Sequence, residues 1–94
     1  MRIVDWFKAK KKENQVRRHL QRLRRNRGDK LSADEIAAIT VLLRNQEAFD
    51  AFVHDLAHAH EQVFAGPMTD FLDWLLENGP AILELVLKIV SLFA

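Results

Sequence analysis

Apolar residues recur at helical spacing along residues 3–26, but they form only a narrow stripe. The stripe falls on Trp6, Ala9, Val16, Leu20 and Leu23, and Glu13 interrupts it. A period between about 3.5 and 3.6 residues predicts an α-helix. The remaining surface of this helix is almost entirely cationic, and like charges one turn apart repel each other. We therefore expect the helix to be unstable alone and to need a counter-surface.

A turn and a capping box separate this helix from a second apolar segment. Gly28 marks the turn, and Ser32 and Glu35 have the spacing at which each side chain caps the backbone N–H of the other residue. The apolar pattern then continues from residue 33 to about 64, which predicts a long central helix of about 48 Å. The pattern is interrupted at residues 44–46. Either the helix breaks there, or it belongs to a coiled-coil-like assembly.

Two glycine–proline pairs divide the C-terminal part of the chain. Gly66-Pro67 ends the central helix, and Thr69 or Asp70 is expected to cap a short helix that follows. Pro80, after Gly79, suits the first residue of a last helix, which is apolar on most of its circumference. This last helix spans about 21 Å, less than the ~30 Å of a bilayer core. The two helices predict a short hairpin that packs in a bundle core, in a core shared between subunits, or at a bilayer interface.

These patterns predict an all-α chain of two parts. Residues 1–30 form a basic amphipathic helical arm, and residues 31–94 form a small helical domain whose apolar C-terminal helix covers residues 80–94. Only about sixty residues lie outside the arm, and a core of that size is marginal alone. We therefore expect a homo-oligomeric helical assembly. The chain has no cysteine, which excludes disulfides and thiolate metal sites.

The formal net charge of +1 conceals two ends of opposite charge. The first thirty residues hold twelve of the fourteen basic residues and only three carboxylates. The other 64 residues hold two basic residues and ten carboxylates. The basic arm of one copy could therefore bind the acidic part of a neighbouring copy. A heterologous contact of this kind builds rings or filaments.

The arm has two chemically different halves. Trp6 and Phe7 before a lysine run are typical of an interfacial membrane anchor, whereas the arginine-rich second half suits phosphate, which guanidinium groups bind bidentately. The predicted contacts to nucleic acid or another anion are Arg17, Arg18, Arg22, Arg24, Arg25 and Arg27. The predicted anchors to a membrane or a partner are Trp6, Phe7, Trp74, Leu83, Leu87 and Val90.

Patterns that carry catalysis are absent from the sequence. His54-Asp55-Leu56-Ala57-His58 superficially resembles the H-E-x-x-H motif of zinc hydrolases, but Asp replaces the glutamate that acts as general base. His54 and His58 are therefore weak metal candidates, and a polar helix face is the favoured interpretation. No phosphate loop, nucleophile elbow or Cys/His pair is present. We expect no enzyme, no cofactor and no small-molecule substrate.

The leading hypothesis is a non-enzymatic structural protein that self-associates, such as a small virion subunit. Its C-terminal helix would lie in a shared core or at a membrane, and its basic arm would hold nucleic acid or lipid headgroups. The alternative is a soluble arginine-rich module that binds nucleic acid, and a histidine metal site is a remote third. The N-terminus has no secretion-signal pattern, so we expect a place inside a cell or a particle, with membrane association as an alternative.

Overall fold

The computed structural model of this chain contains helices and short connections, and no strand, in the residues that it describes. These are residues 3–26 and 28–93 for the backbone, and the same ranges from residue 10 onward for the side chains. The helices of this part are α1 (Ile3–Asn26), α2 (Ala33–Arg44), α3 (Gln46–Ala59), α4 (Glu61–Ala65), α5 (Met68–Glu77) and α6 (Gly79–Phe93). The predicted all-α class is thereby confirmed for the described residues.

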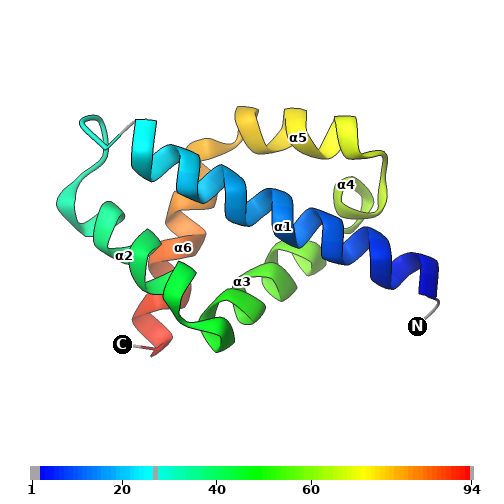
Figure 1. The fold of residues 1–94 in the computed structure, drawn as a ribbon, viewed down its shortest axis with the longest axis horizontal. Coiled ribbons are helices and arrows are strands. Elements are labelled where there is room, and N and C mark those ends of the chain that lie inside the picture. The colour runs from blue at the N-terminus through cyan, green and yellow to red at the C-terminus, as the bar shows by residue number, and fades with distance from the viewer. Residues whose placement is uncertain (1–2, 27, 94) are drawn as a thin grey trace.

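Helix α1 lies across one face of the other helices. Figure 1 shows it running diagonally in front, with α5 along one side, α2 and α3 along the other, and α6 behind. It contacts α2, α4 and α5. The basic helix therefore has the counter-surface that its charge pattern requires.

A single apolar core joins helices from both ends of the chain. Its members are at most 4 % exposed, and they come from α1, α2, α3, α5 and α6. They are Val16, Leu20, Ala38, Ile39, Leu42, Ala48, Phe49, Phe52, Leu56, Phe71, Leu75, Ile82, Val86 and Ile89. Val16 and Leu20 belong to the predicted arm, so this part of α1 packs as an integral layer of the folded body. The division into domains at residue 30 stays a prediction.

Asn45 interrupts the predicted central helix. Its backbone is extended, with φ −106° and ψ 106°, between the end of α2 and the start of α3. The N–H of Asn45 donates to the carbonyl of Val41 (2.9 Å), and its side-chain oxygen accepts from the N–H of Ala48 (3.1 Å). A second interruption at His60 separates α4. A single helix from residue 33 to about 64 is therefore wrong, and the break expected at residues 44–46 is observed.

The capping box at the start of α2 is confirmed, whereas the predicted cap of α5 is wrong. Ser32 Oγ accepts from the N–H of Glu35 (3.1 Å), and the Glu35 carboxylate accepts from the N–H of Ser32 (3.0 Å). Helix α5 begins at Met68 after Pro67, which offers no side-chain cap. Thr69 and Asp70 lie inside the first turn, where a carboxylate is favoured by the helix dipole.

The predicted C-terminal hairpin is also wrong. Figure 1 shows α6 turning away from the end of α5, and α6 packs mainly against α2 and α3. Ile82, Val86 and Ile89 fill the core there because they lie on one side of the helix. Across the described residues, no helix is both long enough and apolar enough to span a membrane.

Candidate anion-binding surface

Lys12 fixes α1 to the rest of the molecule. The residue is 1 % exposed, and its ammonium group donates to the carbonyl of Gly66 (2.7 Å). The ammonium nitrogen also lies 5.4 Å from the ring centre of Phe64 and 5.7 Å from that of Phe71, within the range of cation–π attraction. This role of Lys12 was not predicted from the sequence, because the residue stands in a lysine run. Its four-residue spacing from the buried Val16 is the signal that points to the core.

Arg17 and Arg24 face the body of the protein. The Arg17 guanidinium donates to the carbonyl of Leu43 (3.1 Å) and lies 4.1 Å over the ring of Phe49. Arg24 donates to the hydroxyl of Thr40 (3.3 Å). These two predicted anion contacts therefore hold α1 against α2 and α3. Their contact with an external anion stays a prediction.

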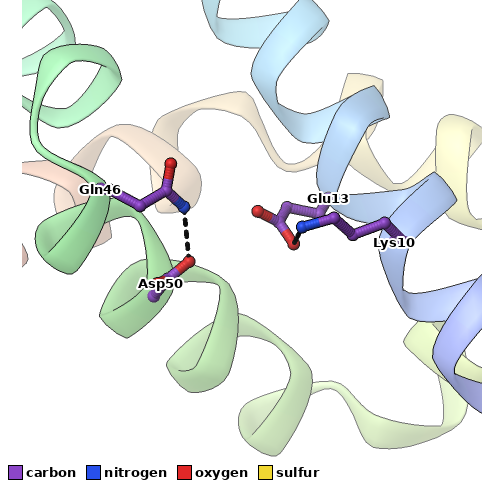
Figure 2. A network of polar contacts seen from close by, with 4 residues as sticks. All are labelled: Lys10, Glu13, Gln46 and Asp50. Carbon is purple, nitrogen blue, oxygen red and sulfur yellow. Dashed lines mark hydrogen bonds and ion pairs between the residues drawn. The ribbon is translucent and has the colours of Figure 1, made fainter.

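The edge of α1 that faces α3 carries an ion pair of its own. Lys10 Nζ lies 3.6 Å from the Glu13 carboxylate, whose side chain is 17 % exposed. Figure 2 shows Glu13 directed toward α3, where the Gln46 amide donates to Asp50 (2.7 Å). On this edge the charge of Lys10 is balanced by Glu13 and the Arg17 guanidinium packs over Phe49, so the exposed positive charge lies on the other side of α1.

Arg18, Arg22 and Arg25 form what we call the arginine stripe. Their spacing of i, i+4 and i+7 places them on one side of α1, and all three are exposed. Within the described residues, none of these side chains makes a hydrogen bond or an ion pair. Together with Gln21 and Asn26 they line a hollow of about 240 Å³. Of the predicted contacts, these three have free guanidinium groups, and Arg27 lies outside the described residues.

The arginine stripe borders a groove between α1 and α5. One hollow of about 160 Å³ is lined by Gln15, Arg18, His19, Arg22, Leu72, Leu75 and Leu76. A larger hollow of about 460 Å³ continues toward the start of α6 and is lined by His19, Arg22, Leu23, Asn26, Leu76, Gly79 and Pro80. Leu76 is 73 % exposed and Leu72 is 36 % exposed. The groove therefore sets guanidinium groups beside an apolar wall.

His19 lies in this groove and carries no charge at neutral pH. Its Nε2 atom is buried and has no hydrogen-bond partner in the described part of the chain. Burial first, and then the positive charge of Arg22, lower the pKa of His19 below the ordinary value of 6.5. The positive charge beside the groove thus comes from the arginines.

The predicted anchor residues occupy different environments. Trp74 is half-buried, with its ring 4.3 Å from the ring of His60. Leu83 and Val90 are partly buried against the core, and Leu87 is 38 % exposed. Trp6 and Phe7 lie outside the described side chains. An anchoring role for these residues stays a prediction.

His54 and His58 stack on the outside of α3. Their ring centres are 6.3 Å apart at an interplanar angle of 4°, and His54 Nδ1 is 3.8 Å from the Asp55 carboxylate. Among the described residues, no group of three or more His, Cys, Asp or Glu side chains is placed to hold a metal ion. The weak metal candidates therefore form only a pair.

Comparisons with protein-family models, curated proteins and solved structures find no match to this chain. The function is therefore inferred from the geometry of the molecule itself.

Proposed function

We propose that this protein is a non-enzymatic nucleic-acid-binding protein, and that the arginine stripe of α1 is its binding surface. The observation that carries the proposal is the set of three exposed guanidinium groups on one side of a helix, without partners in the described chain. Guanidinium groups bind phosphate oxygens bidentately, and phosphate contacts supply most of the sequence-independent affinity for nucleic acids.

The length of the arginine stripe suits a nucleic-acid strand. Arg18 and Arg25 are seven residues apart, which is about 10.5 Å along an α-helix. A strand advances about 3.4 Å per nucleotide along a duplex axis, so the stripe matches about three nucleotide steps. Gln21 and Asn26 line the same hollow, and their amides can contact sugars and base edges.

The stripe is held in place before any ligand arrives. Lys12, Val16 and Leu20 are buried on the opposite side of α1 and tie the helix to the body. A helix that is already ordered does not lose backbone entropy on binding, which favours affinity. This arrangement contrasts with an arginine-rich segment that folds only on its ligand.

We favour nucleic acid over an anionic membrane because amide side chains accompany the arginines. Binding to lipid headgroups needs mainly positive charge beside apolar anchors. Side-chain amides can in addition form hydrogen bonds with the sugars and base edges of nucleic acids. Self-association elsewhere on the surface would leave the stripe available, so the role of a small particle subunit is compatible with this proposal.

The test replaces Arg18, Arg22 and Arg25 together by Gln. Fluorescence anisotropy with labelled single-stranded RNA, single-stranded DNA and duplex DNA measures the affinity over a series of salt concentrations. Each lost phosphate contact lowers the log–log salt slope by about 0.7 for single strands and about 0.9 for duplexes. We expect the triple variant to lose a slope of about 2 to 3 and most of its affinity.

The matched control replaces Lys30, Arg44 and Lys88 by Gln, which removes the same charge from exposed positions outside α1. It is expected to keep nearly the full affinity. Equal losses in both variants would reduce the effect to net charge and contradict the proposal. Flotation with anionic liposomes, with no binding to any of the three nucleic acids, would assign the stripe to lipid instead.

A further inference from the structure

Three stripes of different chemistry run side by side over α1 and α5. The arginine stripe lies on α1, and next to it on α5 is a leucine stripe made of Leu72 and Leu76. At 3.6 residues per turn, Asp70, Asp73 and Glu77 lie farther round α5, on the side away from α1. We call these three residues the acidic stripe, and all of them are exposed.

The acidic stripe has no partner within the described chain. The side chains of Asp70, Asp73 and Glu77 make no hydrogen bond or ion pair with any described residue. The leucine stripe separates them from the arginine stripe, so the two sets of opposite charge stay unpaired within the described part of a single molecule. Each molecule therefore presents positive, apolar and negative rows in that order.

We propose that a second copy of this chain binds here, in an isologous dimer whose two-fold axis passes between the leucine stripes. This axis lies in the plane of contact and runs parallel to the rows. A rotation about it reverses the lateral order of the rows, so each arginine stripe faces the partner's acidic stripe. In an isologous contact every pairing is made twice. The three positive charges of one copy meet three negative charges of the other, and the same happens on the far side of the axis.

The apolar row at the centre has the exposure and shape that such a contact needs. Leu76, at 73 %, is the most exposed of the large apolar residues described, and Leu72 stands one turn before it. The neighbouring hollow of about 160 Å³ is partly walled by leucine, so it can receive an apolar side chain from the partner. Burying large apolar side chains at the centre with charges at the rim is the usual arrangement of a protein interface.

The arrangement also selects a closed dimer over a chain of copies. The arginine and acidic stripes lie on adjacent helices of one face, so a single two-fold contact satisfies both. A head-to-tail contact between opposite ends of the molecule would leave free stripes at each end and continue into a filament. The closed dimer thus pairs three basic and three acidic residues of each copy.

The test measures mass in solution by sedimentation equilibrium, with the full chain at low and high salt and no nucleic acid present. The dimer covers the arginine stripe, so a second copy and nucleic acid compete for the same guanidinium groups. Leaving nucleic acid out keeps the outcome of this test separate from that of the proposed function. One variant carries Arg18→Glu and Arg22→Glu, and a second carries Asp73→Lys and Glu77→Lys. We expect each variant to dimerise at least about a hundredfold more weakly than the wild type, because like charges then face each other.

Two rescue experiments separate this contact from a general effect of charge. A chain with all four substitutions again presents opposite rows, so we expect it to dimerise. Mixing the two monomeric variants is also expected to give a mixed dimer, because both rows of one variant are then net negative and both rows of the other are net positive. Control substitutions Glu47→Lys and Glu84→Lys, on α3 and α6, are expected to leave the mass of the wild-type dimer unchanged.

Circular dichroism spectra of all variants show whether the helices are retained, and Leu76→Ser supplies a second perturbation with no change of charge. It is expected to weaken the dimer while preserving the helical spectrum. A wild-type chain that remains monomeric at low salt and millimolar concentration overturns the proposal. Failure of both rescue experiments overturns it as well.

Discussion

The side chain of Lys12 behaves as a core residue although it ends in a charge. Its hydrocarbon stem lies among apolar groups, and its ammonium group finds the Gly66 carbonyl and two aromatic rings. Gly66 closes α4 just before α5 begins, so one bond joins the start of the chain to a junction more than fifty residues away. Neighbouring lysines of identical chemistry, such as Lys11, are exposed.

Replacing Lys12 by Ala is expected to lower the free energy of unfolding by about 3 kcal/mol. The change leaves a cavity and an unpaired carbonyl at Gly66, and both effects destabilise. Urea unfolding followed by circular dichroism measures the loss. Lys11→Ala is the matched control, and its effect should stay within about 0.5 kcal/mol because the residue is exposed. Equal effects of the two substitutions would contradict a buried anchoring role for Lys12.

Burial of His19 makes the stability of the protein depend on pH. The pKa of His19 is lower in the folded protein than the ordinary value of 6.5 expected for the unfolded chain. At a pH between the folded and the unfolded pKa, the unfolded chain therefore binds the proton more strongly. The contribution of His19 is complete above pH 6.5 and is lost as the pH falls toward its folded pKa. The free energy of unfolding is therefore expected to decrease from pH 7.5 to pH 5.5.

The measurement compares urea unfolding at these two pH values in the wild type, in His19→Gln and in His58→Gln. His58 is exposed, so its substitution is expected to leave the pH dependence nearly unchanged. The decrease should be smaller in His19→Gln than in the wild type. The same decrease in all three proteins would show that other groups cause it.

At the scale of single residues, the sequence distinguishes basic side chains poorly. Arg17 and Arg18 are neighbours with the same chemistry, yet Arg17 lies against Phe49 while Arg18 is exposed. The direction of each side chain depends on how α1 is rotated against the body. That rotation is fixed by tertiary contacts of Lys12, Val16 and Leu20. It could not be predicted from the sequence, because the apolar stripe of α1 is narrow and interrupted.

Among the helices, the connection between α2 and α3 depends on one residue. Asn45 accepts the N–H of Ala48 with its side chain, and its own N–H closes the last turn of α2. It therefore ends one helix and begins the next without an intervening loop. The change of direction places Leu42 and Phe49 in the same core.

Asn45→Ala is expected to lower the free energy of unfolding by about 1 kcal/mol, because the first turn of α3 loses its side-chain acceptor. Asn45→Asp keeps an acceptor oxygen. Its negative charge favours the start of α3 and disfavours the end of α2, so these effects offset and its stability should stay close to that of the wild type. Thermal unfolding of the two variants measures the difference. If the Ala variant is as stable as the Asp variant, the Asn45 side chain does not stabilise α3 as a cap.

The starts and ends of helices were predicted where a side chain forms a local bond and missed where tertiary packing decides. Ser32 and Glu35 cap each other within four residues, so their sequence spacing was sufficient. Thr69 and Asp70 had the right chemistry for a cap, yet the chain becomes helical immediately after Pro67. Packing of Phe71 into the core and its ring contact with Phe64 accompany this earlier start.

For the whole molecule, the separation of charge along the sequence becomes a separation across one surface. The sequence places the positive charge in the first thirty residues and most of the negative charge later. The fold brings α1 and α5 together, so opposite rows lie on neighbouring helices. The class of the fold and the basic character of the candidate surface were predictable from the sequence. The pairing of α1 with α5 was not, because it depends on contacts between residues that are distant in the sequence.

The docking of α1 on later helices has a consequence for the way the protein is made. The ribosome releases α1 before the Gly66 carbonyl and the α5 residues against which it packs have been synthesised. Until then, the apolar side of α1 has no α5 surface to cover it. The packing of α1 is therefore expected to be completed only after α4 and α5 have been made.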